Sequence, residues 1–441
     1  MSKTKRRACC ARNAAVICGC FFLSLSHLAV AKTLCVNPKG SSGCYTTIGA
    51  AVAAASAGDT VNVGPGQYAE SVTIAKPIAL VGSGPESTII NAHGLATGIY
   101  VDGLDNGGLA NVLVTGFTVT NANFEGILVT NTSSSVIANN HVANNDQSLD
   151  YASAKCPGLP DFETNEGEDC GEGVHLAGTF NVTVANNVIE LNSGGILLSD
   201  ETGETYENLI TGNTVRDNAL DCGITLASHA PAPQTKAKAP FGVVSNNIVA
   251  NRVSRNGLVG MGAGVGIFAP GPGNLAFSNK VIGNTILNNG LPGVAVHNHA
   301  APPGAPAPNY NDIVILGNYI AGNGADTQDA ATPASAGINV YGPAPAYATE
   351  ILENTIQNEA IGVAMNNPGG MDVHLNNLLT GVGVNNLGKG SVNATLNFFG
   401  CNGGAEDQSQ CGTKGPAIVS SPSSPGPVPT APQGPRPRGG M

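Results

Sequence analysis

The chain has 441 residues, of which only 11% are charged, and its formal net charge at pH 7 is −11. An acidic surface repels phosphate backbones, so nucleic acid is excluded as an expected partner. After the first 31 residues, no apolar run is long enough to span a bilayer, so no membrane span is expected.

The first segment, residues 1–31, resembles a secretory signal peptide. It has a basic start, an apolar stretch from Ala14 to Leu25 and small residues at Ala29 and Ala31. It carries five of the 19 basic residues and none of the 30 acidic ones, so its removal leaves a net charge of about −16. We therefore expect a secreted, periplasmic or cell-surface protein.

The remaining sequence is dominated by a repeated phrase in which an Asn precedes a short aliphatic run, a second Asn or Gly, and another apolar run. The leading Asn recurs at Asn140, Asn187, Asn213, Asn247, Asn284, Asn318, Asn354, Asn377 and Asn397, with Phe117 in the same place earlier. Repeats of this length are typical of solenoids. The basic coil is about 20 to 26 residues long, and several coils carry insertions.

The apolar runs predict strands rather than helices. They are short, rich in Val and Ile, and bounded by Asn and Gly. Between Asn187 and Ser199, alternation predicts that Ile196 and Leu198 point inward and Leu197 outward. Asn tolerates positive φ, and amides on stacked coils about 4.8 Å apart can hydrogen-bond into a ladder. The prediction is an all-β parallel solenoid of roughly a dozen coils.

This repeat resembles the right-handed parallel β-helix proteins of the pectate-lyase-like superfamily, above all their Asn/Gly-rich carbohydrate-associated modules. The segment from Tyr45 to Tyr68 resembles the start of such domains, which implies a short N-terminal helix that caps the first coil. The resemblance implies one β-helix domain at residues 32–415 and polysaccharide as the partner. It supplies no catalytic residue, because the signature segments of the pectate lyases, polygalacturonases, pectin esterases and alginate epimerases are absent.

Seven cysteines follow the signal segment. In an oxidising compartment their spacing suggests the pairs Cys35–Cys44, Cys156–Cys170 and Cys401–Cys411. Cys222 is left over, and we expect it to be a buried, small apolar residue rather than a reactive thiol.

Candidate functional residues follow the strands that begin with Gly-Ile or Gly-Val. Alignment of the coils places Asp200, Glu201, His229, His297 and His299 in one column, with long insertions after His229 and His299. Carboxylate and imidazole groups side by side can perform general acid–base catalysis. The alternative is that these residues are an ordinary polar surface.

The column leaves three functions open. The first is a secreted protein that binds polysaccharide without catalysis, the second is a polysaccharide lyase or glycoside hydrolase, and the third is an adhesin-like extracellular rod. Whether the protein is an enzyme is undecided by the motifs.

Two segments of the sequence suggest metal-binding sites. His297 and His299, two apart on an extended segment, point to one side, as two metal ligands require. The acidic insertion from Asp146 to Glu172 could bind Ca²⁺ through carboxylate oxygens, although no calcium-loop spacing is visible. A solvated acidic loop is the alternative, and no other cofactor is expected.

The chain ends in a Pro-, Ser- and Gly-rich segment, residues 416–441. This composition predicts a disordered tail. We expect the protein to be a monomer.

Overall fold

The structure is a computed structural model, and it describes residues 31–149, 156–163, 170–231, 236–259, 262–299, 302–327, 331–407 and 411–436. All but the last residue of the expected signal peptide lies outside the described residues. Within the described ranges, no helix is long and apolar enough to cross a membrane.

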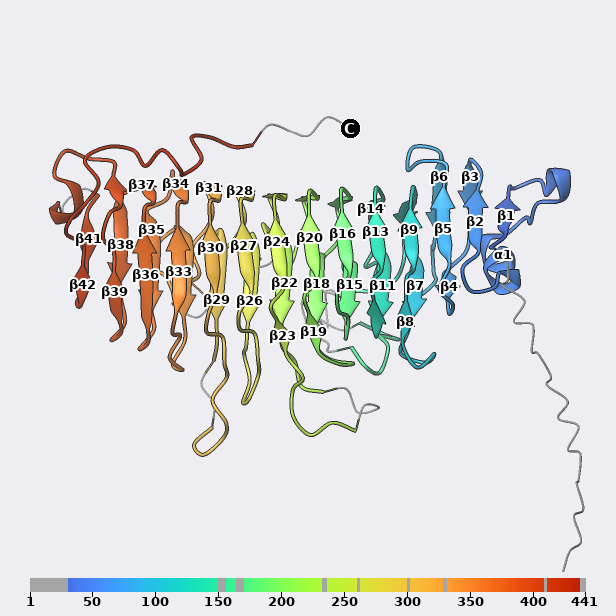
Figure 1. Ribbon diagram of the computed structural model, residues 1–441, viewed down its shortest axis with the longest axis horizontal. Coiled ribbons are helices and arrows are strands. Elements are labelled where there is room, and N and C mark those ends of the chain that lie inside the picture. The colour runs from blue at the N-terminus through green and yellow to red at the C-terminus, as the bar shows by residue number, and fades with distance from the viewer. Residues whose placement is uncertain are drawn as a thin grey trace, which may run out of the picture.

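The described residues form an elongated solenoid with three long parallel sheets, which we name A, B and C (Figure 1). Sheet A has 14 strands, namely β1 (Thr33–Val36), β2 (Thr60–Val63), β5 (Ala79–Gly82), β9 (Leu113–Thr115), β13 (Val136–Ala138), β16 (Thr183–Ala185), β20 (Leu209–Thr211), β24 (Asn247–Val249), β27 (Lys280–Ile282), β30 (Val314–Leu316), β33 (Thr349–Leu352), β36 (Gly370–His374), β39 (Ser391–Asn393) and β42 (Ile418–Val419).

Sheet B has 12 strands, namely β3 (Gly66–Tyr68), β6 (Thr88–Asn91), β10 (Thr118–Thr120), β14 (His141–Ala143), β17 (Val188–Glu190), β21 (Thr214–Arg216), β25 (Arg252–Ser254), β28 (Thr285–Leu287), β31 (Tyr319–Ala321), β34 (Thr355–Gln357), β37 (Asn377–Leu379) and β40 (Phe398–Phe399).

Sheet C also has 12 strands, namely β4 (Val72–Ile74), β7 (Ile99–Asp102), β11 (Ile127–Thr130), β15 (Glu172–Ala177), β18 (Gly194–Ser199), β22 (Ile224–Ala227), β26 (Val265–Phe268), β29 (Val294–His297), β32 (Ala336–Tyr341), β35 (Ile361–Asn366), β38 (Val382–Asn386) and β41 (Thr413–Lys414). The chain visits A, B and C in turn, which confirms the predicted solenoid of about a dozen coils.

Shorter elements lie at the corners and the ends. Two small parallel pairs join β8 (Leu109–Ala110) to β12 (Thr132–Ser133) and β19 (Thr205–Tyr206) to β23 (Val243–Val244). Helix α1 (Ile48–Ala54) packs against β1, β2 and β4, as expected for a cap on the first coil. Short 3₁₀ turns cover Ser41–Gly43 and Gly404–Glu406.

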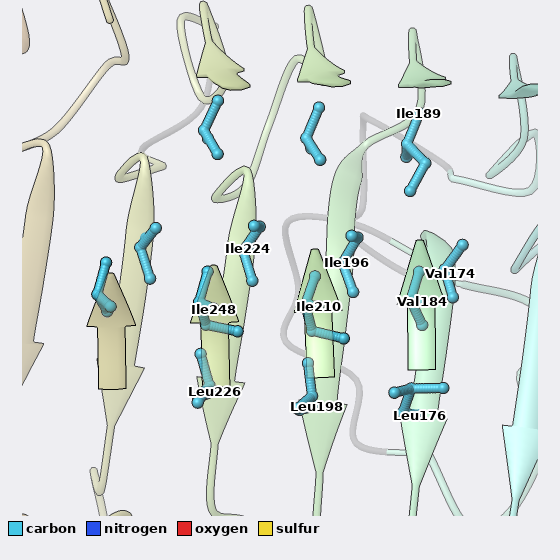
Figure 2. Close-up of a cluster of buried hydrophobic side chains, with 14 of the residues drawn as sticks. Val174, Leu176, Val184, Ile189, Ile196, Leu198, Ile210, Ile224, Leu226 and Ile248 are labelled. Atoms are coloured by element: carbon cyan, nitrogen blue, oxygen red, sulfur yellow. The ribbon is translucent and has the colours of Figure 1, made fainter. Parts of the chain in front are cut away.

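The core is a stack of aliphatic side chains that face the axis from all three sheets (Figure 2). Ile196 and Leu198 are fully buried, and they lie level with Ile224 and Leu226 on the next strand of sheet C. Leu197 points away from this core, as predicted, and packs under the loops outside sheet C. Each buried Val, Leu or Ile stabilises the fold by about 1.5–3 kcal/mol.

The turns between sheets explain the Asn-rich sequence. At the corner from A to B, a residue with left-handed φ such as Asn186 (φ 55°) or Gly212 (φ 65°) precedes a buried Asn. Asn and Gly adopt this conformation with little strain. The buried Asn then hydrogen-bonds to the equivalent Asn of the next coil. For example, Asn187 donates to Asn213 Oδ1 from its backbone N at 2.9 Å and from Nδ2 at 3.0 Å.

These bonds form ladders along the solenoid. The A-to-B ladder contains Asn140, Asn187, Asn213, Asn251, Asn284, Asn318, Asn354, Asn376 and Asn397, and the Asn140 amide oxygen also accepts from the backbone of Phe117. The sequence pattern therefore identifies seven of the nine Asn positions. The other two predicted positions, Asn247 and Asn377, lie on strands β24 and β37, and the ladder residues of these coils are Asn251 and Asn376.

A second ladder follows the corner from B to C. It contains Asn145, Asn192, Asn218, Asn256, Asn289 and Asn323 and ends at Glu359, whose Oε1 accepts from Asn323. Burial raises the pKa of Glu359 to about 7, whereas its hydrogen bonds from Asn323 and Gly322 act in the opposite direction.

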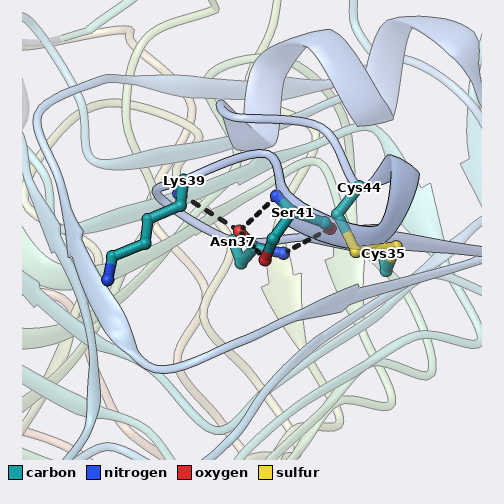
Figure 3. Close-up of a disulfide and its surroundings, with 5 residues drawn as sticks. All are labelled: Cys35, Asn37, Lys39, Ser41 and Cys44. Carbon is teal, nitrogen blue, oxygen red and sulfur yellow. Dashed lines mark hydrogen bonds between the residues drawn. A yellow bond between two sulfur atoms is a disulfide. The ribbon is translucent and has the colours of Figure 1, made fainter.

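All three expected disulfides are present, Cys35–Cys44, Cys156–Cys170 and Cys401–Cys411. Around the first, Asn37 Oδ1 accepts from the backbone N of Lys39 and of Ser41, both at 3.1 Å (Figure 3). Disulfides persist in oxidising compartments, which indicates an extracytoplasmic location.

Cys222 is a free cysteine and is buried, as expected. Burial raises the pKa of its thiol well above the ordinary value, so the thiolate that would react is disfavoured.

The final segment differs from the expected disordered tail. Ile418–Val419 pairs with β39, and the following residues run back over β37, β34, β31 and β28 (Figure 1). Val428 N donates to Asn377 Oδ1 at 2.7 Å, and Arg436 N donates to Thr285 Oγ1 at 3.2 Å. Proline has no backbone N–H, and a proline-rich segment can follow this path because its contacts with the solenoid use few backbone donors. Residues 437–441 lie outside the described part.

We predict that Asn213→Ala lowers the free energy of unfolding by about 2–4 kcal/mol, because it removes the acceptor of Asn187 N and Nδ2, the donor to the Val184 carbonyl, and one of the two donors to Asn251 Oδ1. Chemical denaturation measures the loss. The control is Asn402→Ala, which alters an exposed Asn outside the ladders. Equal losses in both variants would contradict a special role for the ladder.

A second prediction concerns pH. The pKa of Glu359 rises from an ordinary value of 4.5 to about 7 on folding, so its contribution to stability is full below about pH 4.5 and is lost as pH rises through about 7. Glu359→Gln keeps an acceptor for Asn323 but removes the charge. We expect it to raise the free energy of unfolding at pH 8, by up to about 3 kcal/mol, and to change it little at pH 4.5. An equal gain at both pH values would refute this account.

Candidate functional site

The expected column lies at the ends of the sheet C strands, where the chain leaves the sheet for the longer loops (Figure 1). Ser199, Ala227, Phe268, His297 and Tyr341 occupy equivalent positions on successive strands. The candidate residues Asp200, Glu201, His229, His297 and His299 follow these positions directly or occupy them. The structure divides them into two groups: Asp200, Glu201 and His229 follow β18 and β22, and His297 and His299 lie at the end of β29, on the other side of β26.

Asp200 is fully buried and holds the loops together. Its carboxylate accepts from Ser228 Oγ at 2.8 Å and from the backbone N of His229 and of Gly242, both at 2.6 Å. Burial raises the pKa of Asp200, and these three hydrogen bonds act against that rise. The carboxylate thus fixes both ends of the insertion that follows His229, which makes Asp200 a positioning residue for His229.

Glu201 belongs to a buried acid–imidazole chain that the column did not include. Glu201 Oε2 accepts from Ser199 Oγ at 2.9 Å and lies 3.6 Å from His175 Nε2. His175 Nε2 lies 2.8 Å from Ser199 Oγ, and its other nitrogen, Nδ1, lies 3.4 Å from Glu125 Oε1. All of these side chains are at most 2% exposed.

This chain borders a small cavity outside sheet C. The cavity is lined by Glu125, Leu159, Glu163, Cys170, Gly171, Glu172, His175, Leu197, Glu201 and His229. Its free volume is about 20 Å³, which suits a water molecule or a single ion. The Cys156–Cys170 disulfide closes the acidic insertion over it.

Acidic groups around the cavity are poorly solvated. Burial raises the pKa of Asp146 to about 8, opposed by the backbone of Cys170 and assisted by the charge of Glu125. Asp146, Glu163 and Glu172 belong to the insertion that was proposed to bind Ca²⁺. Its residues Asp150, Glu166, Glu168 and Asp169 lie outside the described residues.

One group in the described part of the chain could hold a metal ion with three or more ligands. It consists of Glu125, Glu163 and His175, which each offer one ligand atom within 4.8 Å of the others. His297 and His299 are close together, as predicted, with ring centroids 4.8 Å apart, but they are not part of such a group.

The second group of column residues is a row of rings. The His297 ring contacts Tyr341 edge-on at a centroid distance of 4.6 Å and Phe268 at 5.9 Å. His297 Nδ1 also lies 3.8 Å from Asp326 Oδ2. His299 is exposed, and Phe268 and Tyr341 are partly exposed.

The ring row continues into an open pocket of about 320 Å³ lined by Thr327, Thr332, Pro333, Asn366 and Leu387. Asn366 is the register partner of Tyr341 on the next strand. Phe268, His297, Tyr341 and Asn366 thus occupy one register position on four successive strands of sheet C.

The sequence analysis did not identify Glu125 and His175 of the buried chain, although a sequence pattern points to each of them. Glu125-Gly126-Ile127 and Glu172-Gly173-Val174 are the same phrase, and the register of Ile127 with Val174 stacks the two glutamates. His175 lies between inward-facing Val174 and Leu176, so alternation places it outward. The sequence positions of Glu125 and His175 do not reveal that loops cover and bury both side chains.

Glu190 and Arg216 are register partners on neighbouring strands of sheet B and form an ion pair. His141 Nε2 lies 3.0 Å from Glu190 Oε1, and Arg255 makes two bonds to Asp217, at 2.7 and 2.5 Å. The pairs lie on the partly exposed face of sheet B, where each contributes under about 1 kcal/mol.

Comparison with known proteins identifies the fold. Residues 86–279 match the family model described as "Right handed beta helix region", so the solenoid is a right-handed parallel β-helix. No curated protein matches the sequence.

Solved structures with a similar fold have low sequence identity to this chain. The catalytic domain of a GH87 alpha-1,3-glucanase aligns over 82% of this chain and 63% of its own, at 12% identity and a TM-score of 0.49, so this chain spans less than two thirds of it. PfbA, a surface adhesin of Streptococcus pneumoniae, aligns over 85% of both chains at 13% identity and a TM-score of 0.49. The alginate lyase AlyF-OU02 aligns over 90% of this chain and 88% of its own, at 12% identity and a TM-score of 0.46.

Proposed function

We propose that this protein is an extracytoplasmic polysaccharide-binding protein and that the glycan lies along the outer face of sheet C. The observation that carries the proposal is the ring row, in which Phe268, His297 and Tyr341 occupy one register position on successive strands. Aromatic faces and edges offer apolar contact to the C–H faces of sugars, while their polar tips can hydrogen-bond to hydroxyl groups.

The spacing of the row suits a polymer. Successive coils lie about 4.8 Å apart, close to the length of one pyranose residue in an extended chain. The adjoining pocket at Asn366 and Leu387 adds a polar and an apolar group on the next coil. A repeated ligand thus meets a repeated surface, and each additional sugar unit can use the same kind of contact.

The charge of the protein favours neutral polysaccharides. A net charge of about −16 without residues 1–31 repels acidic glycans unless a cation lies between the two.

We predict that Tyr341→Ala weakens polysaccharide binding about tenfold, because it removes the ring at the end of the row that is next to Asn366. Affinity electrophoresis and calorimetry against a panel of neutral and acidic polysaccharides, each with and without Ca²⁺, would measure this. The matched control is Tyr347→Ala, which removes a ring that is 55% exposed in the same coil but six residues beyond the row. Equal affinities of the two variants would exclude the ring row as the binding face.

A second function, hydrolysis or lyase cleavage of the bound glycan, is favoured by the imidazole and carboxylate groups of His229, Glu172 and Glu201 at one cavity. Such groups can supply the acid and the base of either reaction. The similar structures include two polysaccharide-cleaving enzymes and one adhesin, and the shared fold does not decide between catalysis and binding.

The same panel tests catalysis. If the protein cleaves a glycan, new reducing ends or unsaturated products appear, and we expect Glu201→Gln and His229→Ala each to reduce their rate at least 100-fold. Glu190→Gln, on the exposed face of sheet B, is the control and keeps full activity. Circular dichroism verifies that each variant folds. Binding without products across the panel would restrict the function to binding.

A further inference from the structure

We infer that Glu125, Glu163 and His175 bind a first-row divalent metal ion such as Mn²⁺ or Zn²⁺ in the cavity outside sheet C. The inference is independent of the glycan-binding proposal, because it rests on the buried cluster and not on the ring row. It concerns neither His297 and His299 nor an all-oxygen calcium loop.

The three ligand atoms already face one another. One atom from each side chain lies within 4.8 Å of the other two. Ligands about 2.0–2.2 Å from an ion can be at most about 4.4 Å apart, so a small contraction closes the site. Glu125 and His175 stand on neighbouring coils of sheet C, and Glu163 comes from the insertion that the Cys156–Cys170 disulfide holds in place.

The orientation of His175 matches that of a metal ligand. When one nitrogen of a histidine ring binds a metal, the N–H of the other ring nitrogen usually donates a hydrogen bond to a carboxylate or another acceptor. This bond fixes the orientation of the ring and its tautomer. Here Nε2 lies 2.8 Å from Ser199 Oγ, and Ser199 in turn donates to Glu201. When Nε2 carries the proton, the lone pair of Nδ1 points toward Glu125.

This tautomer creates an electrostatic need for a cation. Nδ1 lies 3.4 Å from Glu125 Oε1, so two electron-rich atoms face each other across a buried space. Glu125 is 1% exposed, and its second oxygen, Oε2, has no hydrogen-bond partner among the described residues. A buried carboxylate oxygen without a hydrogen-bond partner is costly, and an ion between Glu125 and His175 would neutralise both the carboxylate and the facing lone pair.

The site also selects the kind of ion. Ca²⁺ and Mg²⁺ prefer oxygen ligands alone, whereas a mixed set of imidazole and carboxylate suits Mn²⁺, Zn²⁺ and their neighbours. The free volume of about 20 Å³ admits an ion or a water molecule. Glu172 and Glu201 in the cavity wall add negative charge that attracts a cation.

The competing occupant is a proton, since an imidazolium at His175 would also neutralise Glu125 and Glu201. The experiment compares chelator-treated protein after addition of MnCl₂, ZnCl₂, CaCl₂ or NaCl at equal ionic strength. We expect one Mn²⁺ or Zn²⁺ per chain by elemental analysis after gel filtration. We also expect the melting temperature to rise by about 3–5 °C at a 100-fold excess over Kd.

Two variants locate the ion. Glu163→Gln removes a charged ligand from a partly exposed loop position, and His175→Gln removes the nitrogen ligand; each should reduce the metal-induced rise to less than a third. His141→Gln, which breaks an exposed histidine–glutamate pair on sheet B, is the matched control and keeps the full rise. Because Glu163→Gln leaves the core intact, its metal-free melting temperature should equal that of the wild type.

No bound metal and no rise with any of the salts would overturn the inference in favour of a proton. A rise with CaCl₂ alone, or a rise that persists in both ligand variants, would overturn it as well. Tyr341→Ala should keep the full metal response, so failure of the glycan-binding proposal and failure of the metal site remain distinguishable.

Discussion

The stacking of one coil on the next, fixed by buried Asn ladders, is the constraint on which the rest of this structure depends. The ladder Asn side chains bond to the coils on both sides: Asn187 Nδ2 donates to the Ile137 carbonyl in the preceding coil, and Asn187 N and Nδ2 donate to Asn213 Oδ1 in the next coil. Without these bonds, the corners would bury unpaired polar groups. The ladders set the register, and the register in turn decides which side chains become neighbours.

Function follows from this register because residues far apart in sequence meet on one face. His175 lies 50 residues from Glu125 and 24 from Ser199, yet it contacts both. The corners themselves have little freedom to vary, so chemical variety is confined to outward positions of the strands and to the insertions. Sheet C carries the longer insertions, and its outer face accordingly holds both the buried cluster and the ring row.

The sequence predicted the solenoid, the capping helix, the three disulfides and the neighbouring positions of Asp200 and His229, because all of these depend on local patterns or on a constant period. It missed the roles of Glu125 and His175, since their environment is created by a loop of irregular length folded over them. The path of the chain after Pro416 was also not predictable. Its composition indicates a low propensity for regular structure, but it does not indicate that the side of the solenoid offers a surface against which the segment can pack.

The ends of the solenoid have a consequence for assembly. A stack of parallel strands has two open edges, and each could template another copy and build a fibre. At one end α1 and the Cys35–Cys44 loop lie against the first strands, and at the other the Cys401–Cys411 loop and the returning chain after β42 do so. These caps act as polymerisation stops, so the protein can expose long repetitive faces while its own repeats are kept from continuing into a neighbour.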